Sequence, residues 1–146
     1  MVLGGSRGIG AAIVRHFASA GAKVIFSYSG SPDAAAAVAA ETGATAVKAD
    51  SANRDELIAA VAAAGALDVM VVNAGVAIMG DPLTLDPDVV DRLIDINVRA
   101  AYFASVEAGR QMHDNGRIII IGSINGDRVP WPGQTAYALS KSAVQG

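Results

Sequence analysis

Short apolar runs rich in β-branched residues alternate along the chain with longer stretches that are Ala-rich or amphipathic. Each run is continuously apolar, which predicts strands buried on both faces, as in a parallel sheet covered by helices. The alternation of strands and helices indicates βαβ units with right-handed crossovers in one α/β domain. The predicted strands are Met1–Leu3, Val24–Phe26, Thr45–Ala49, Leu67–Val72 and Arg117–Gly122.

Five helices are predicted from apolar periodicity and from capping residues at their ends. The longest runs from Asp86 to about Met112, and a shared face is formed in it by Val90, Leu93, Ile94, Asn97, Ala101 and Ala104. The others are Gly10–Ser19 before Gly21, a helix that starts at Ser31 and Pro32, Asn53–Ala64 before Gly65, and a helix that begins near Thr135.

A glycine-rich loop lies between the first predicted strand and the first predicted helix. It reads GGSRGIG, from Gly4 to Gly10, with the spacing Gly-x-x-x-Gly-x-Gly. Glycines in such a loop permit a sharp turn and close approach of the backbone to a diphosphate, and the helix N-terminus offers free N–H groups to the phosphates. An ordinary tight turn is the alternative, but the flanking strand and helix favour a nucleotide site.

The end of the second predicted strand indicates which dinucleotide would fit. A site selective for NAD usually has an acidic residue there, which bonds the ribose 2′-hydroxyl. This chain has Tyr28 at that position, between Ser27 and Ser29, so no carboxylate would repel a 2′-phosphate. Arg7 would pair with that phosphate, unless it is only a solvated loop residue. The sequence therefore favours NADP(H) over NAD(H).

Candidate catalytic residues follow the fourth and fifth predicted strands, where ligands bind in doubly wound sheets. Asn73–Gly75 follows one strand and Ser123 the other, and the last helix has Tyr137 and Lys141 on one face. A free tyrosine is a poor base at neutral pH, but a nearby ammonium and a cationic nicotinamide favour the phenolate. The phenolate would then exchange a proton with an alcohol or ketone oxygen.

Two further residues would support this chemistry. Ser123 would donate a hydrogen bond to the substrate oxygen, and Asn97 would bind a water that connects Lys141 to solvent, because a buried amide is costly unless it is bonded. Each residue also has an ordinary explanation: a surface Tyr–Lys pair, a serine in a turn, and an asparagine that bonds a kinked backbone. Their joint occurrence in order along the chain favours catalysis.

Composition narrows the classes of partner. Hydrophobic residues make up 52% of the 146 residues and charged residues 17%, which is typical of a globular protein. The net charge is −3 and no block of Lys and Arg is present, so a nucleic-acid polymer or a membrane surface is not an expected partner. The absence of cysteine excludes disulfides and thiolate metal sites, no metal is expected, and the predicted location is cytoplasmic.

Over its whole length the chain resembles the short-chain dehydrogenases/reductases. The resemblance implies a Rossmann doubly wound parallel sheet with strand order 3-2-1-4-5 and hydride transfer between NADP(H) and a carbonyl or alcohol substrate. It implies that the catalytic residues are Asn97, Ser123, Tyr137 and Lys141. The implied cofactor-binding residues are Gly4, Ser6, Arg7, Gly8, Ile9, Gly10, Tyr28, Asp50, Ser51, Asn73, Ala74, Gly75, Tyr137 and Lys141, with Asp50 and Ser51 at the adenine.

Two features resemble a narrower branch of this family, the cyclic-di-GMP-binding biofilm dispersal mediators. Leu3 stands where most family members have Thr, and Gly126–Arg128 reads Gly-Asp-Arg, as in that branch. Arg128 would meet a phosphate or a guanine edge, or would be an ordinary loop arginine. Three functions stay open: an NADP(H)-dependent oxidoreductase, a cyclic-di-GMP-binding regulator on the same fold, and a truncated product without activity.

Family members run to roughly 250 residues, as expected of a large single α/β domain. Residues 1–146 are therefore expected to be the N-terminal, dinucleotide-binding part of a longer domain, truncated before a sixth and a seventh strand. We expect this part alone to be a weak or inactive enzyme, because an open sheet edge would follow the fifth strand. The resemblance also implies a homo-oligomer, dimer or tetramer, for the full-length protein.

Overall fold

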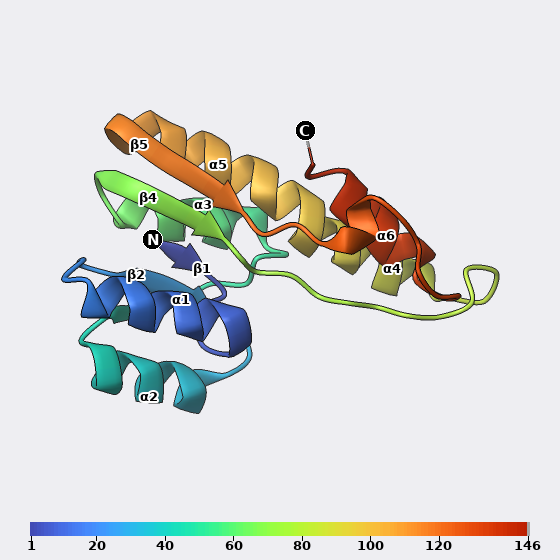
Figure 1. The fold of residues 1–146 in the computed structure, drawn as a ribbon, viewed down its shortest axis with the longest axis horizontal. Helices are drawn as coiled ribbons and strands as arrows, with labels where there is room; N and C mark the ends of the chain where they lie inside the picture. The colour runs from blue at the N-terminus through green and yellow to red at the C-terminus, as the bar shows by residue number, and fades with distance from the viewer. Residues whose placement is uncertain (146) are drawn as a thin grey trace.

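Five parallel strands form one sheet in this computed structural model, which describes residues 1–145 (Figure 1). Their order is β3-β2-β1-β4-β5, which confirms the predicted Rossmann arrangement. In this order β1 lies at the centre of the sheet, where Val2 pairs with both Phe26 and Val71. The strands are β1 Val2–Leu3, β2 Ile25–Tyr28, β3 Thr45–Lys48, β4 Leu67–Val72 and β5 Met112–Ile120.

Helices cover both faces of the sheet. The helices α1 (Gly8–Ser19) and α2 (Pro32–Thr42) contact each other on one face, and α3 (Arg54–Ala63) contacts α5 (Ala100–Gln111) on the other (Figure 1). The helix α4 (Pro87–Ile94) leads into α5, and a short 3₁₀ turn (Ile124–Gly126) precedes α6 (Thr135–Ser142). The predicted glycine stops are confirmed, since Gly21 and Gly65 have φ values of 85° and 71° directly after their helices.

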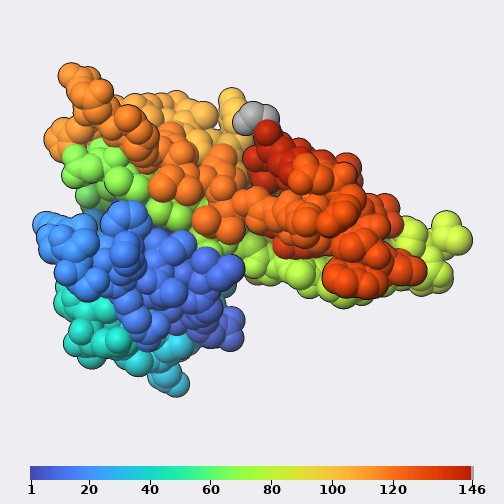
Figure 2. All heavy atoms as spheres, viewed as in Figure 1, coloured from blue at the N-terminus to red at the C-terminus, as the bar shows by residue number. Residues whose placement is uncertain are grey.

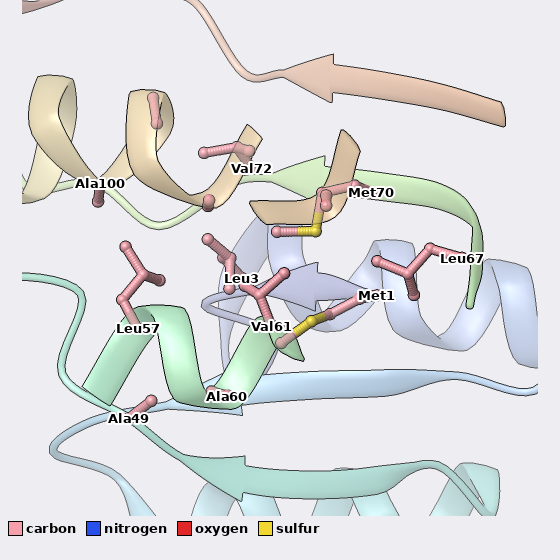
Figure 3. Packing of buried hydrophobic residues seen from close by; sticks show 13 residues of the cluster. Met1, Leu3, Ala49, Leu57, Ala60, Val61, Leu67, Met70, Val72 and Ala100 are labelled. Carbon is pink, nitrogen blue, oxygen red and sulfur yellow. The ribbon is translucent and has the colours of Figure 1, made fainter. Parts of the chain in front are cut away.

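Alternate residues of the central strands pack against different helix layers. Leu3 and Met70 are fully buried in a cluster with Val61 of α3 and with alanines of α5 (Figure 3). Phe26 is fully buried in a second cluster, with Val14 of α1 on the other face. Successive side chains of a strand point to opposite faces, so the continuous apolar runs fill two cores at once.

The edge strand β5 departs from its prediction in its start and in its burial. It begins at Met112, which pairs with Leu67, whereas the next register pair joins Arg117 to Val69. Residues 113–116 leave the regular ladder between those pairs, and Asn115 has a φ of 67°. Burial on both faces is wrong for β5, because Ile118, Ile119 and Ile120 are 39%, 44% and 39% exposed at the edge of the described sheet.

The longest predicted helix is interrupted. A π-helical segment, Asp95–Arg99, joins α4 to α5, so the expectation of one regular helix from Asp86 to about Met112 is wrong in that turn. Single π turns are rare and are often found at functional sites. Asn97, at the centre of the segment, is buried in the interior, and its contacts with distant residues are not encoded in helical periodicity.

Two segments far apart in sequence lie side by side next to the sheet. The loop after β4 runs beside the segment that leads into α6, and both extend to one end of the molecule (Figures 1 and 2). The amide of Gly80 donates a hydrogen bond of 2.9 Å to the carbonyl of Gly133, which joins the two. Within residues 1–145 no helix is both long enough and apolar enough to span a bilayer.

Candidate active site

A cleft of about 510 Å³ lies at the carboxyl ends of the strands. The segments that follow all five strands meet there, together with one face of α6. This is the edge at which doubly wound sheets bind nucleotides. The lining includes thirteen of the predicted residues: Gly4, Ser6, Arg7, Ile9, Gly10, Tyr28, Asp50, Ser51, Asn73, Ala74, Gly75, Tyr137 and Lys141.

The glycine loop packs too closely for a side chain at Gly4, Gly5 and Gly10. Gly4 has a φ of 73°, and a Cβ on it would lie 3.0 Å from the Cα of Ala74. A Cβ on Gly10 would overlap the carbonyl oxygen of Gly4 and lie 2.5 Å from Nδ2 of Asn73. Glycine is therefore required here for backbone conformation and for the approach of α1 to the strand ends.

Side chains at the ends of β2 and β4, the two strands that flank β1, hold this loop in place. The amide of Gly4 donates to Oγ of Ser27 at 3.1 Å, and Nδ2 of Asn73 donates to the carbonyls of Leu3 and Gly4 at 3.3 and 3.0 Å. Leu3 is fully buried and contributes no side-chain polar group. Ser27 therefore supplies a hydroxyl that holds the loop, a role that only its contact across the sheet reveals.

The N-terminus of α1 opens toward the cleft. Arg7 precedes the helix and provides no side-chain cap, so the first-turn N–H groups are available to an anion. Arg7 is exposed, lines the cleft, and makes no ion pair with the described residues. Together the helix end and the guanidinium form a local positive site on a chain whose net charge is −3.

Asp50 is the carboxylate in the lining of the cleft. Burial raises the pKa of this carboxyl, but the amide of Ala52 and the guanidinium of Arg92 together outweigh that effect and hold it below the usual value. The amide donates to Oδ1 at 3.0 Å and Nη2 of Arg92 lies 3.0 Å from Oδ2. Arg92 lines the cleft as well, although no sequence pattern pointed to it.

Asn97 connects three parts of the structure through its side-chain amide. Its Oδ1 accepts the amide of Val76 at 2.8 Å, and its Nδ2 donates to the carbonyl of Val76 and to Oγ of Ser140, both at 2.9 Å. These bonds join the π-helical segment to the loop after β4 and to α6. Protein groups thus bond both N–H groups of the amide and one lone pair of its Oδ1, and the binding of a water by Asn97 stays a prediction.

Tyr137 and Lys141 face the cleft from α6, as their spacing predicted. Nζ of Lys141 lies 6.0 Å from the centre of the Tyr137 ring and donates a hydrogen bond of 2.8 Å to the carbonyl of Ile121. Burial lowers the pKa of Lys141. No carboxylate forms an ion pair with this ammonium among residues 1–145.

Ser123 lies beside the cleft, directly after Gly122 in the lining. Its Oγ accepts the amide of Asn125 at 3.2 Å, and its hydroxyl donates a long hydrogen bond of 3.5 Å to Oδ1 of the same residue. Nδ2 of Asn125 in turn donates to Oε1 of Gln134 at 2.7 Å in a buried pair. This pair ties the turn after β5 to the start of α6.

Comparison with known proteins identifies the family. A family model described as short chain dehydrogenase matches residues 1–146. The chain belongs to this family. The predicted resemblance and the predicted strand order are both confirmed by this match and by the observed sheet.

Individual short-chain dehydrogenases are similar to the chain along its whole length. The cyclic-di-GMP-binding biofilm dispersal mediator protein of Escherichia coli is 61% identical over 146 residues, which are 100% of this chain and 62% of that protein. Elsinochrome reductase 1 of Elsinoe fawcettii is 38% identical, over 99% of this chain and 58% of that protein. The crystal structure of BdcA in complex with NADPH has a TM-score of 0.98 at 61% identity, over 99% of this chain and 59% of that one.

Three predicted site residues lie outside the cleft lining. Gly8 begins α1 with a φ of 54°. Asn97 lies behind Gly75, with its Oδ1 3.4 Å from the position of a Cβ on that glycine. Ser123 lies next to the lining. Sequence patterns gave no role to Ser27, Arg92, Asn125, Gln134 or Ser140, because their importance comes from contacts between distant segments.

Replacement of Gly10 by Ala should destabilise the fold by about 1–3 kcal/mol, because the new Cβ has no space between Gly4 and Asn73. Gly109→Ala in α5 is the matched control, since a Cβ there meets nothing within 4 Å and φ is ordinary. That control should gain about 0.5–1 kcal/mol from its helical propensity. Urea denaturation measures both variants, and a neutral Gly10→Ala would contradict the close packing.

Proposed function

We propose that the protein is an NADP(H)-dependent oxidoreductase that transfers hydride between the nicotinamide and a carbonyl or alcohol substrate. One observation carries the proposal: a single cleft contains the glycine loop at one place and the pair Tyr137 and Lys141 at another. A phosphate-binding helix end and a proton-exchanging pair are the two parts that such a reaction requires. The bound cofactor would supply the hydride to a carbonyl or accept it from an alcohol.

The polarity of the cleft supports NADP(H) over NAD(H). Tyr28, at the end of β2, is half-buried in the lining, and its neighbours Ser27 and Ser29 also line the cleft. A 2′-phosphate in this region would meet hydroxyl groups and the exposed guanidinium of Arg7, with no carboxylate from the β2 end. Asp50, further along the lining, would serve the adenine. The NADPH complex of BdcA, 61% identical to this chain, supports the same cofactor.

The chain's own residues supply binding and proton exchange. Lys141 would donate to the nicotinamide ribose, and its ammonium favours the phenolate of Tyr137, which would exchange a proton with the substrate oxygen. Ser123, whose hydroxyl makes only a long bond of 3.5 Å to Asn125, would donate that proton to the same oxygen. Asn97 would hold α6 and the loop after β4 in place around them.

The chain spans about three fifths of the length of the relatives that it matches, 62% and 58% of the first two. The substrate, the oligomer and the turnover of a whole protein are therefore proposals by family likeness. We expect residues 1–146 alone to turn over slowly, since Tyr137 is only half-buried and the isoleucines of β5 are exposed. Cofactor binding, which uses the described cleft, is the more direct test.

Arg7→Ala should weaken NADPH binding by about tenfold and leave NADH binding unchanged, because a charge-assisted bond to the 2′-phosphate is lost. Arg15→Ala is the matched control, since Arg15 lies in α1 but pairs with Glu41 at 2.8 Å away from the cleft. Titration of each variant by nicotinamide fluorescence gives the two affinities. Equal losses for NADPH and NADH would show that Arg7 does not read the phosphate.

NADPH affinity should fall as pH rises through the alkaline range, starting below the pH at which an ordinary lysine titrates. Burial lowers the pKa of Lys141 in the free protein, and a ribose hydrogen bond favours its charged form, so affinity is greatest below that pKa and is lost above it. Lys141→Gln should remove this dependence, whereas Lys23→Gln, exposed and away from the cleft, should retain it. An NADPH affinity that does not change with pH in the unaltered chain would refute the role of Lys141 in binding the ribose.

A cyclic-di-GMP-binding regulator is the second candidate function. Its support is the biofilm dispersal mediator of Escherichia coli, 61% identical to this chain, and the exposed side chain of Arg128 in the Gly-Asp-Arg segment. Isothermal calorimetry with cyclic-di-GMP should then show binding that Arg128→Ala weakens by about tenfold. The control is Arg110→Ala on α5. If the unaltered chain gave heat with NADPH but none with cyclic-di-GMP, only the oxidoreductase would remain as a candidate function.

A further inference from the structure

A serine hydroxyl is buried inside the helix that carries Tyr137 and Lys141. Ser140 has no exposed surface and directly precedes Lys141 in α6. Its Oγ lies 2.7 Å from the carbonyl oxygen of Tyr137 and 2.9 Å from Nδ2 of Asn97. A serine in the middle of a helix usually bonds only its own preceding turn, which does little for stability. The second bond, to another helix, is what sets Ser140 apart.

The direction of each hydrogen bond in this group is fixed. The amide of Val76 can only donate, so the atom of Asn97 that faces it at 2.8 Å must be Oδ1. Nδ2 therefore faces Ser140 and must donate to it. The hydroxyl accepts that bond and has its single proton left for the carbonyl of Tyr137. The result is a directed relay from Asn97 through Ser140 to the backbone of Tyr137.

This relay ends on a peptide group that belongs to the candidate catalytic pair. In an α-helix the carbonyl of Tyr137 also accepts the amide of Lys141, four residues later. Two other hydrogen bonds attach α6: Lys141 to the carbonyl of Ile121, and Ser142 to the carbonyl of Gly126. Both lead to the segment after β5. Among the described residues, only Ser140 bonds α6 to the π-helical segment.

We propose that Ser140 is a positioning residue, whose relay from Asn97 fixes α6 against the π-helical segment and so places Tyr137 and Lys141 at the nicotinamide end of the cleft. This inference rests on the proposed function. Loss of the hydroxyl leaves one N–H of Asn97 buried without its partner and frees α6 to shift. A shift of α6 moves the nicotinamide end, whereas the glycine loop and Asp50 are attached to other elements.

Two probes separate the ends of the cleft: NADPH, which spans it, and adenosine 2′,5′-bisphosphate, which has no nicotinamide. Ser140→Ala should weaken the affinity for NADPH by about tenfold and leave the affinity for the bisphosphate unchanged. Ser140→Cys, similar in volume but with a weak donor, should show the same selective loss and serves if the alanine variant does not fold. Ser142→Ala, which removes a hydrogen bond of 2.7 Å from the same helix, is the matched control and should change neither affinity.

The outcomes distinguish this inference from the function on which it rests. An unaltered chain that bound neither probe would refute the oxidoreductase and Ser140 would lose its role with it. A second outcome is that the unaltered chain binds both probes, while the Ser140 variants lose affinity for neither probe or lose it equally for both. That result would refute the positioning role of Ser140 and leave the proposed function standing. If Ser142→Ala lost as much NADPH affinity as the Ser140 variants, the loss would follow from removing any hydrogen bond of α6 and would not be specific to Ser140.

Discussion

The buried amide of Asn97 is the interaction on which the arrangement of the site depends. An amide inside a helix layer must be bonded, since leaving it unpaired costs about 1–3 kcal/mol per group. Here Val76 and Ser140 provide the bonds, so the cost of burial is offset only when the loop after β4 and α6 are both in place. One polar side chain thus couples the formation of a π-helical turn to the position of Tyr137 and Lys141.

A second asparagine, Asn73, holds the glycine loop in place in a similar way. Asn73 follows β4 and bonds the carbonyls of Leu3 and Gly4, so the glycine loop is held by its neighbour in the sheet. Ser27 holds the same loop from the other side. Backbone ladders end where the strands end, and side-chain amides and hydroxyls continue the connection beyond them. The cleft is therefore built on the sheet edge without being part of the sheet.

The parts that the sequence predicted well are those determined locally. Glycines at Gly21 and Gly65 end helices through a left-handed backbone, and β4 was predicted at its observed bounds because a run of apolar residues needs two buried faces. The π turn at Asn97, the early start of β5 and the role of Ser140 were not predicted. Each is set by a partner from a distant segment, which periodicity and spacing do not record.

Amide hydrogen exchange with and without NADPH would show whether one ligand spans the cleft from the glycine loop to α6. We expect slower exchange on NADPH addition in three separate segments: the start of α1, the loop after β4 near Asn73–Val76, and α6. Protection confined to one of these segments, or none in the presence of saturating NADPH, would contradict it.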